Sequence, residues 1–461
     1  MYTLGDPGFS SLASIRAPIF RRDQSTHTSF YAPGYLAVVA STRADEFEST
    51  LRESPASLHP VAASLLHHAE WAEASHAANS TQPFEPVCLT IYPGSQCNLR
   101  CTYCYASPSR ARAPKLDSSA IRTAGEYVIA NCVKRGVPFT TVFHGGGEPG
   151  LFRDLIDRAL DELGEMAAAE GVAIFRYVAT NGVLPATRAR WLAQRFDTVG
   201  LSCDGPERFQ SVQRPTWSGG STTPCVERTA TVVRSQGTPL HVRVTITSRT
   251  LLHQGEITQY LCERLRPDEI HIEPLYVGGR AGSRASLLPE QATTFVDGFV
   301  QARSVAAAFG IPVQTSGSRL SEIHGPYCNV LRDVLQVVPG GVATTCFKTG
   351  NAAEAVTQRT TLGGCGNDGN ALTLDIGRIT RLRGLLSRWP AGCQDCFNRF
   401  HCTHGCPDSC PLDPKADASD FRCQVQMMLA RRALDALAEA TWKDARRNQD
   451  RGIVGCEVGS L

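Results

Sequence analysis

Cys97-Asn-Leu-Arg-Cys101-Thr-Tyr-Cys104 places three cysteines on one short loop, in a C-x3-C-x2-C run. The run follows an apolar segment, residues 87–92, which we expect to form a strand. Three thiolates on one loop can bind a single inorganic centre, and iron–sulfur clusters are normally held by four. Because no fourth cysteine follows nearby, the run predicts a cluster with one iron left open for chemistry. A zinc loop, which favours a second cysteine pair or a histidine at a set distance, and three buried cysteines are the alternatives.

The spacing of this run also resembles the signature of the radical S-adenosylmethionine (SAM) superfamily, C-x3-C-x-aromatic-C, with Tyr103 as the aromatic residue. The resemblance implies a four-iron four-sulfur cluster on Cys97, Cys101 and Cys104. It also implies that SAM chelates the open iron through its amino and carboxylate groups, with Tyr103 close to the cofactor.

The composition of the chain limits its class. The 461 residues include 46 basic and 44 acidic ones, so no overall charge favours nucleic acid or a membrane surface. The eighteen cysteines gather at 97–104 and 393–423, which favours metal over disulfides in a long chain. Residues 1–22 lack a signal-peptide pattern, and no apolar run approaches the roughly 20 residues of a membrane span. We therefore expect a soluble cytoplasmic protein that is sensitive to oxygen.

Strand and helix patterns alternate from residue 86 to 316, which predicts a parallel sheet covered by helices. The expected strands are 87–92, 139–143, 175–179, 198–203, 241–247 and 269–275, and the expected helices are 117–135, 151–170, 186–196, 224–236 and 254–266. The fold class is α/β, and six such units match the partial (β/α)6 barrel of the superfamily over residues 85–316. Ligands of such sheets bind at the carboxyl ends of the strands.

Residues 1–84 precede the cysteine run and predict a small α+β module. Residues 17–22 and 34–40 have the pattern of short strands, and 44–54 and 59–78 that of helices. Residues 80–83 have the composition of a linker. The module is either a docking site for the leader of a peptide substrate, as some radical SAM peptide maturases carry, or a cap on the barrel.

Two motifs follow the second and third expected strands. The first, Phe143 to Pro149, contains Gly146, Gly147, Glu148 and Pro149 and resembles the superfamily motif that holds the SAM amino group. Glycines let the backbone approach a ligand that side chains would exclude. The second is Thr180-Asn181-Gly182, which is either an ordinary tight turn or the position that the family uses near the SAM ribose.

A third motif, Ser202-Cys-Asp204-Gly-Pro, follows the fourth strand, with Arg214 ten residues beyond Asp204. It resembles the S-x-D-G-P of peptide-modifying radical SAM enzymes, in which the serine and the arginine help to hold the SAM carboxylate. A hydroxyl and a guanidinium suit a buried carboxylate. Glu273-Pro274, at the end of the sixth strand, is either part of a substrate pocket or structural.

A second set of cysteines follows an expected helix at 288–309 and an expected strand at 311–316. Its pattern is Cys328, then a hairpin with Gly341-x4-Cys346, then Cys393-x2-Cys396-x5-Cys402-x3-Cys406, and finally Cys423. The alternative to iron–sulfur chemistry is one or two structural zinc sites.

This second pattern resembles the SPASM domain of radical SAM enzymes that modify peptides and proteins, here over residues 317–430, with a C-terminal helix and tail at 431–461. The resemblance implies two auxiliary clusters. One would use Cys393, Cys396, Cys402 and Cys423; the other would use Cys328, Cys346 and Cys406, with Cys410 or Cys365 as candidates for its fourth ligand. Cys410 could instead compete with Cys423, and if neither candidate binds, the open iron of the second cluster could contact the substrate.

Three functions compete. The first is a maturase that oxidatively crosslinks a ribosomally made precursor peptide. The second is an anaerobic sulfatase-maturing enzyme that forms formylglycine from Cys or Ser. The third is a non-catalytic metal-binding scaffold, for which the Gly-Gly-Glu-Pro and Ser-x-Asp-Gly motifs would have no purpose. An enzyme would need SAM, a peptide or protein substrate, and an electron donor such as a flavodoxin or ferredoxin. The sequence assigns no acid or base to the substrate.

Overall fold

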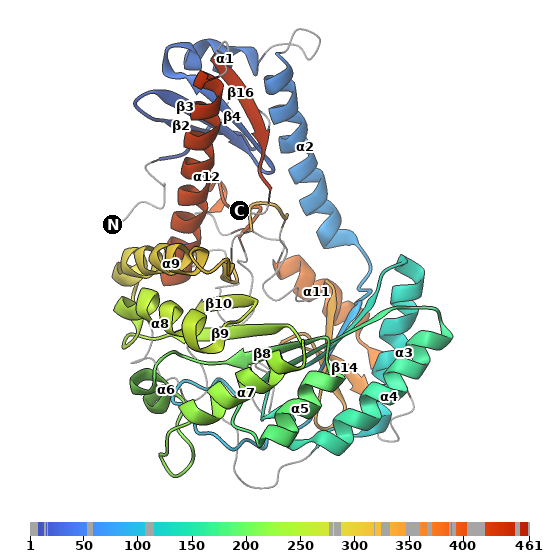
Figure 1. Ribbon diagram of the computed structural model, residues 1–461. Helices are drawn as coiled ribbons and strands as arrows, with labels where there is room; N and C mark the ends of the chain where they lie inside the picture. Colours follow the sequence, from blue (N-terminus) through green and yellow to red (C-terminus); the bar gives the residue numbers. More distant parts are fainter. Residues whose placement is uncertain are drawn as a thin grey trace.

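A computed structural model describes residues 8–12, 15, 17–52, 59–106, 115–275, 280, 287–317, 319–323, 332–346, 360–366, 371–386, 389, 393–402, 420–447 and 452–459. Within these residues the strands form two sheets, one of five strands and one of eleven. The smaller sheet lies at one end of the molecule and the larger sheet at the other (Figure 1).

The central part of the larger sheet is parallel and follows the chain order. It comprises β5 (Cys88–Ile91), β6 (Phe139–Phe143), β7 (Ile174–Thr180), β8 (Thr198–Ser202), β9 (Leu240–Ile246) and β10 (Glu269–Pro274). These are the six strands that the sequence predicts. The fold class, an α/β partial barrel with additional parts, is confirmed.

Helices cover the outer face of this sheet, because alternate strand residues are apolar and point towards them. The helices are α3 (Ser118–Arg135), α4 (Arg153–Ala169), α5 (Ala186–Arg195), α7 (Thr223–Ser235) and α8 (Gln254–Tyr260), which continues as the π-helix Leu261–Leu265. The short α6 (Glu207–Gln213) follows the loop after β8, and its Gln213 contacts Asp204 and the backbone of Thr102. On β9, Val242, Val244 and Ile246 are buried in the core that these helices complete. The residues between them point to the inner, concave face, where a ligand would bind.

The larger sheet continues beyond the six predicted strands at both edges. The helix α9 (Ala292–Ala307) leads to β11 (Val313–Gln314), which pairs with β10. At the other edge β12 (Val334–Val338) runs parallel to β5, followed by β13 (Val342–Thr344), β14 (Thr361–Cys365) and β15 (Leu372–Leu374), which are antiparallel; α11 (Ile376–Leu386) comes next. The predicted hairpin is the β12–β13 turn, where Gly340 and Gly341 have φ of 89° and 70°. The sheet therefore crosses the expected boundary at residue 316.

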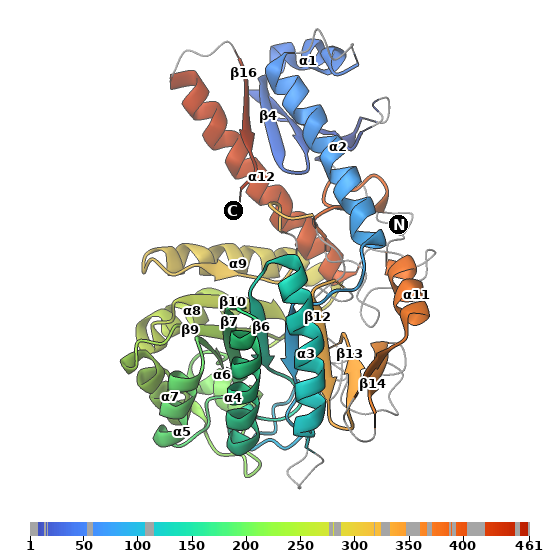
Figure 2. The same cartoon turned by 90° about the vertical axis from the view of Figure 1, so that its right-hand side faces the viewer.

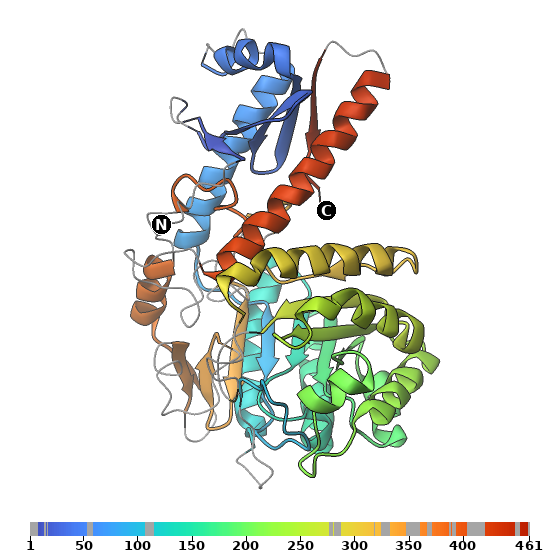
Figure 3. The same cartoon turned by 90° about the vertical axis from the view of Figure 1, so that its left-hand side faces the viewer.

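The smaller sheet combines the two ends of the chain. Its order is β1 (Ser10–Ser11), β2 (Phe20–Asp23), β3 (His27–Ala32), β4 (Tyr35–Ala40) and β16 (Ile453–Glu457), all antiparallel. The helices α1 (Ala44–Thr50) and α2 (Pro60–Thr81) pack on one face, and α12 (Phe421–Arg447) packs on the other (Figures 2 and 3). The expected module of residues 1–84 thus takes in a strand from the expected tail, residues 431–461.

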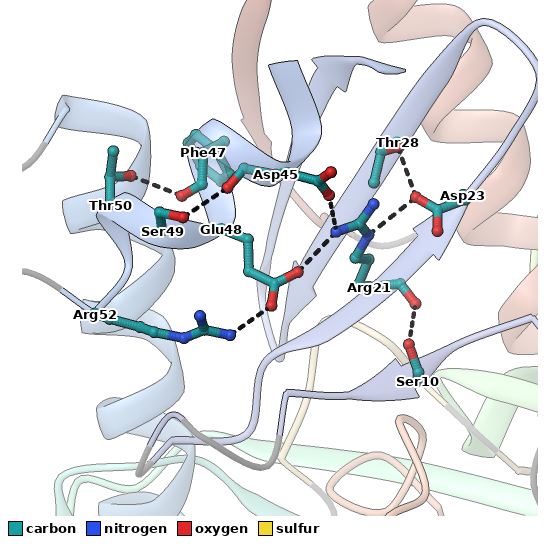
Figure 4. Close-up of polar contacts among 10 residues, drawn as sticks. All are labelled: Ser10, Arg21, Asp23, Thr28, Asp45, Phe47, Glu48, Ser49, Thr50 and Arg52. Atoms are coloured by element: carbon teal, nitrogen blue, oxygen red, sulfur yellow. Dashed lines mark hydrogen bonds and ion pairs between the residues drawn. The ribbon is translucent and has the colours of Figure 1, made fainter. Parts of the chain in front are cut away.

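A shared guanidinium joins β2 to α1 within this module. Arg21 lies 3.0 Å from Asp23, 2.8 Å from Asp45 and 2.8 Å from Glu48, and Glu48 also binds Arg52 at 2.7 Å (Figure 4). Several of these side chains are exposed, so each pair contributes no more than about 1 kcal/mol to stability. The network fixes the angle between strand and helix.

The module is also joined to the second cysteine region. Arg22 binds Asp435 of α12 through two hydrogen bonds, of 2.7 and 3.1 Å. The hydroxyl of Tyr31 lies 2.6 Å from Nε2 of His401, whose Nδ1 faces the carbonyl of Glu322 at 2.7 Å. Burial lowers the pKa of His401 to about 4, so the neutral ring donates to the carbonyl and accepts from the tyrosine.

None of the helices in the described part of the chain has the length and apolar composition that a bilayer crossing requires.

Candidate functional site

The cysteine run lies between β5 and α3, at the carboxyl end of the strands. Cys97 and Cys101 are 9% and 8% exposed and form an apolar cluster with Leu99, against which Cys104 and Val183 pack. The run is held by backbone hydrogen bonds to the segment after α6: the amides of Arg100 and Thr102 donate to the carbonyls of Pro215 and Gln213, each at 2.9 Å. The three thiols therefore share one small enclosed site.

Burial makes these thiols poor at carrying a charge without a cation. It raises the pKa of Cys97 to about 12 and that of Cys101 to about 11. The amide of Leu99 and Nδ2 of Asn181 donate towards Sγ of Cys97, at 3.4 and 3.7 Å. A positively charged metal deprotonates its thiol ligands, and hydrogen-bond donors stabilise the thiolate that results. Buried thiols that face such donors are therefore compatible with metal binding. The donor set therefore fits an iron–sulfur cluster.

No group of three or more His, Cys, Asp or Glu side chains among the described residues is arranged to hold a single metal ion. A cluster binds each thiolate through a different iron, so this finding does not bear on a cluster.

Residues 144–149 pack against the loop that precedes the cysteine run. A Cβ atom at Gly146 would lie 1.5 Å from the ring of Tyr92, and one at Gly147 would lie 2.0 Å from the carbonyl oxygen of Gln96. The amides of Gly147 and Glu148 donate to the carbonyls of Gly94 and Gln96, each at 2.9 Å. Only glycine permits this approach, which brings the backbone of the motif beside the cysteine run.

Glu148 is 2% exposed and connects its own loop to the end of β7. One carboxylate oxygen accepts from the Thr180 hydroxyl at 2.6 Å and from the amide of Gly150 at 2.9 Å, and the other accepts from the amide of Asn181 at 2.7 Å. Burial raises the pKa of Glu148, while these donors favour its charged form. The hydrogen bond between Glu148 and Thr180 thus links the loop after β6 to the end of β7. Pro149 begins the short 3-10 turn Pro149–Leu151.

Asp204 of the third motif is fully buried and contacts Tyr103, the aromatic residue of the cysteine run. Its carboxylate accepts from the Tyr103 hydroxyl at 2.7 Å, from Nε2 of Gln213 at 2.9 Å and from the amide of Thr245 at 3.0 Å. The guanidinium of Arg214, 8% exposed, donates to the same hydroxyl at 2.6 Å. The structure thus brings Tyr103, Asp204 and Arg214 together, with Ser202 at the end of β8.

Two buried polar groups beside these loops lack hydrogen-bond partners among the described residues. Nε of Arg214 has none, and neither atom of the Gln336 side-chain amide has one. Gln336 lies in β12, paired with Thr90 of β5, and its Nε2 is 3.7 Å from where a Cβ of Gly145 would be. Unsatisfied polar groups in a protein interior are rare, so both suit a polar ligand such as SAM at this end of the sheet.

The second cysteine set is described only in part. Cys328, Cys406 and Cys410 lie outside the described residues. Cys393 and Cys396 share one turn, and Sγ of Cys402 lies 2.9 Å from Oε1 of Gln426, three residues along α12 from Cys423.

Two further cysteines of this set lie in or beside the larger sheet. Cys346 is buried beyond β13. Sγ of Cys365 lies 3.7 Å from the carbonyl of Ala120 in α3, and burial raises its pKa. Cys365 therefore packs against a helix of the outer face.

The inner face of β9 and β10 holds Glu273, which the sequence marked as a pocket candidate, together with polar residues that sequence reasoning did not assign. Arg243 is in register with Ser202 on one side and with His271 on the other. Nε2 of His271 lies 2.5 Å from Oε1 of Glu273 and 3.0 Å from the hydroxyl of Ser316, and the amide of Ser316 donates to the same carboxylate. The available signal was the alternation of polar and apolar residues along both strands.

Comparison with known proteins identifies the central part of the chain. The model of the Radical SAM superfamily matches residues 91–264. These residues belong to the radical SAM superfamily. The match spans the end of β5 to the segment after α8 and includes the cysteine run and the three motifs, so this part of the chain carries a radical SAM domain.

The curated relatives of this chain include enzymes named as anaerobic sulfatase-maturating enzymes. A cysteine-type anaerobic sulfatase-maturating enzyme of Clostridium perfringens (strain 13 / Type A) is 30% identical over 182 residues, 39% of this chain and 49% of the relative. A serine-type anaerobic sulfatase-maturating enzyme of Klebsiella aerogenes is 26% identical over 207 residues, 44% of this chain and 50% of the relative. The chain thus spans about half the length of the curated relatives it matches.

Solved structures extend the similarity of fold. Native anSMEcpe with bound AdoMet and Kp18Cys peptide has a TM-score of 0.60 at 19% identity, covering 77% of this chain and 99% of that one. Streptococcus suis SuiB bound to S-adenosylmethionine has a TM-score of 0.52 at 16% identity, covering 83% of this chain and 95% of that one. At these identities the likeness concerns the fold alone.

Proposed function

We propose that this radical SAM enzyme reductively cleaves SAM and oxidises a residue of a peptide or protein substrate. The observation that supports this most directly is the convergence of the cysteine run with the Gly-Gly-Glu-Pro and Ser-x-Asp-Gly-Pro loops at one end of the parallel sheet. When bound, the cluster and SAM would supply an electron and a 5′-deoxyadenosyl radical that removes hydrogen from an unactivated carbon.

The chain's own residues would hold and orient these groups. Cys97, Cys101 and Cys104 would bind the cluster. The backbone of Gly146 and Gly147 would face the SAM amino group, while Glu148 fixes their loop to β7.

The opposite side of the SAM site would come from β7, β8 and the loops that follow them. Arg214, with its unpaired Nε, and Ser202 would meet the SAM carboxylate, and Asn181 would lie near the ribose. Asp204 would position Tyr103 and Arg214.

The second cysteine set would hold two auxiliary clusters and form a SPASM domain. Cys393, Cys396, Cys402 and Cys423 would form one; Cys328, Cys346 and Cys406 would form the other, with Cys410 or Cys365 as its fourth ligand. The proximity of Cys402 to α12, which carries Cys423, supports the first set. Such a centre would accept the electron that an oxidised substrate releases.

Two substrate classes fit this proposal. One is a ribosomally made precursor peptide, crosslinked by the enzyme; the docking module at 1–84, whose sheet also takes in residues 453–457, supports it. The other is a sulfatase in which a Cys or Ser becomes formylglycine, supported by the names of the curated relatives. Cysteine clustering and iron–sulfur chemistry suit a reducing compartment, so we place the enzyme in the cytoplasm, with a flavodoxin or ferredoxin as electron donor.

Anaerobic reconstitution with iron, sulfide, SAM and dithionite tests the activity. We expect release of 5′-deoxyadenosine by the native chain and none by a Cys97→Ala, Cys101→Ala, Cys104→Ala variant, which keeps iron at the second cysteine set. Turnover by the variant would refute the catalytic role of the run, and inactivity of both would favour a metal-binding scaffold.

Co-expression with a candidate substrate separates the two substrate classes. Mass spectrometry would detect a crosslinked peptide that has lost a hydrogen pair if a small neighbouring open reading frame encodes the substrate. Formylglycine in a neighbouring sulfatase would instead establish the second class.

A further inference from the structure

A hollow of about 380 Å³ lies outside the SAM site, at the N-terminal ends of α3 and α4. Four cationic side chains and two carboxylates line it: Lys115, Arg153, Arg158, Arg188, Asp117 and Asp154. We call this surface the cationic hollow. The whole chain carries a formal net charge of only +2, yet four positive and two negative charges give this one hollow the same +2.

Three of the four cations are held in place by aromatic rings. Nζ of Lys115 lies 5.9 Å from the ring centre of Phe152, and the guanidinium carbons of Arg153 and Arg188 each lie 5.6 Å from that of Trp191. Aromatic faces attract cations, so these rings fix the direction of each charge. Two like charges that converge on one ring repel each other, and an incoming anionic group would relieve that repulsion.

The two carboxylates of the hollow offset only part of its positive charge. Asp117 caps α3, accepting from the amide and hydroxyl of Ser119 at 2.9 and 2.8 Å. These donors lower the pKa of Asp117 and occupy one of its oxygens. Arg153 also binds Asp157, at 3.2 Å, whereas no ion pair involves Lys115 or Arg158 among the contacts of the described residues.

The wall of the hollow is the reverse side of the loops that form the candidate site. Lys115 pairs with Gly94 in a β-bridge, and the amide of Leu116 donates to the carbonyl of Pro93 at 3.0 Å. Gly94 is three residues before Cys97. Leu151, 39% exposed, ends the turn that follows Glu148 and lies in the same hollow. A protein bound here would therefore lie against the segments that carry the cysteine run.

We propose that the cationic hollow docks an acidic surface of the protein that donates the electron, a step that rests on the proposed function. One electron would leave a reduced low-potential flavin or iron–sulfur centre of that partner and enter the cluster that Cys97, Cys101 and Cys104 would hold. The partner is oxidised by one electron, and no covalent bond changes in this step. Complementary charge would orient the partner and speed its encounter.

Charge reversal provides the test, with a matched control. Lys115→Glu/Arg158→Glu changes the net charge of the hollow by four units and leaves the aromatic anchors of the two other arginines intact. Arg303→Glu/Arg381→Glu makes the same change at exposed positions of α9 and α11, away from the hollow. Binding of a purified acidic flavodoxin to each full-length protein is measured at low salt by surface plasmon resonance, which does not depend on turnover.

We expect the hollow variant to weaken flavodoxin binding by about tenfold or more and the control to change it little. Dithionite-driven release of 5′-deoxyadenosine should be equal in all three proteins, whereas flavodoxin-driven release should fall only in the hollow variant. Absence of flavodoxin binding to the native chain, or equal weakening by both variants, would overturn the proposal. Inactivity of the native chain with dithionite would instead refute the proposed function. The binding measurements would then still show whether flavodoxin docks at the cationic hollow.

A small anion is the competing occupant of the hollow. Inorganic phosphate is therefore compared with chloride at the same ionic strength. Equal inhibition of flavodoxin binding supports screening of a protein–protein contact. Stronger inhibition by phosphate, lost in the hollow variant, would assign the hollow to a small anion and overturn the docking.

Discussion

The hydroxyl of Tyr103 lies 2.7 Å from Oδ2 of Asp204, which joins the cysteine run to the loop after β8 across 101 residues of sequence. The same hydroxyl accepts from Arg214, so a buried cation and a buried anion meet through one phenol. Neither charge is satisfied by solvent, since both residues are buried. The alignment of the two motifs therefore depends on this contact.

Tyr103→Phe should destabilise the fold by about 1–3 kcal/mol, because it leaves a donor of Arg214 without its acceptor in the interior. Urea denaturation of the apo chain measures the change. Tyr127→Phe is the matched control, since its hydroxyl lies on a partly buried ring and donates to a neutral backbone carbonyl, that of Phe84, at 3.0 Å. If both variants lose the same free energy of unfolding, the Tyr103 hydroxyl contributes no more to stability than the Tyr127 hydroxyl does.

Glu148→Gln should weaken SAM binding by about tenfold or more while the chain remains folded. The amide group of glutamine cannot accept from Thr180, Gly150 and Asn181 together, so one donor at the end of β7 loses its partner. Equilibrium dialysis with SAM under anaerobic conditions measures the affinity. The exposed Glu165→Gln, on α4, is the control, and unchanged SAM affinity in Glu148→Gln would contradict the role of this carboxylate as the link between loops.

His144 should make stability depend on pH below neutrality. Burial, with a smaller effect of the Arg243 charge, lowers the pKa of its imidazole to about 3, whereas the unfolded residue titrates near 6.5. Between these values the unfolded chain binds a proton that the folded chain does not, so stability falls as the pH falls from about 6.5 to about 3. At pH 5.5 the cost amounts to about 1 kcal/mol.

His144→Gln removes this titration. Urea midpoints at pH 7.5 and 5.5 should therefore differ less in the variant than in the native chain. If the native chain loses no more stability between pH 7.5 and 5.5 than the variant does, His144 is not held neutral in the folded state.

The positions of the barrel strands and helices could be predicted from the sequence because their periodicity is local. The strand expected at residues 139–143 has the same bounds in the structure. β3 was missed, since all six of its residues are buried and its polar and apolar residues do not alternate. β16 was missed because Ile453–Glu457 is ordered by pairing with β4, more than 400 residues earlier, and such pairing leaves no local signal.

The motifs of the site could be placed at strand ends from sequence, but their mutual contacts could not. Glu148 meets Thr180 and Asn181, and Tyr103 meets Asp204, only because the parallel strands align their carboxyl ends. Gln336 lies beyond the expected barrel, so nothing in the sequence connected it with this end of the sheet.

Glu273→Gln should uncouple SAM cleavage from substrate oxidation. If the substrate is oxidised after hydrogen removal, a proton must also be released, and we expect Glu273, which His271 and Ser316 hold on the inner face of β10, to accept it. Product formed per 5′-deoxyadenosine should fall by on the order of a hundredfold while 5′-deoxyadenosine release continues. Both are measured with the substrate found by co-expression. Glu269→Gln, on the same face of β10 but near its start, is the control, and equal ratios in the two variants would exclude this role.

Gly455→Val should release β16 from the edge of β4. A Cβ at Gly455 would lie 2.1 Å from the hydroxyl and 2.7 Å from the ring of Tyr35, which is stacked on His68 at 5.0 Å, so a shift of the Tyr35 ring would disturb this stacking. An exposed edge strand is a template for pairing with another peptide. If residues 1–84 dock a leader, the variant should bind a precursor peptide more tightly, since β16 no longer occupies that edge.

Fluorescence anisotropy of a labelled precursor measures this affinity, and limited proteolysis after residue 447 reports the release of the strand. Gly459→Val is the matched control, because a Cβ there has nothing within 4 Å. Release of β16 without any gain in peptide affinity would mean that β4 does not receive the leader. The module of residues 1–84 would then act as a cap, stabilised by the C-terminal strand.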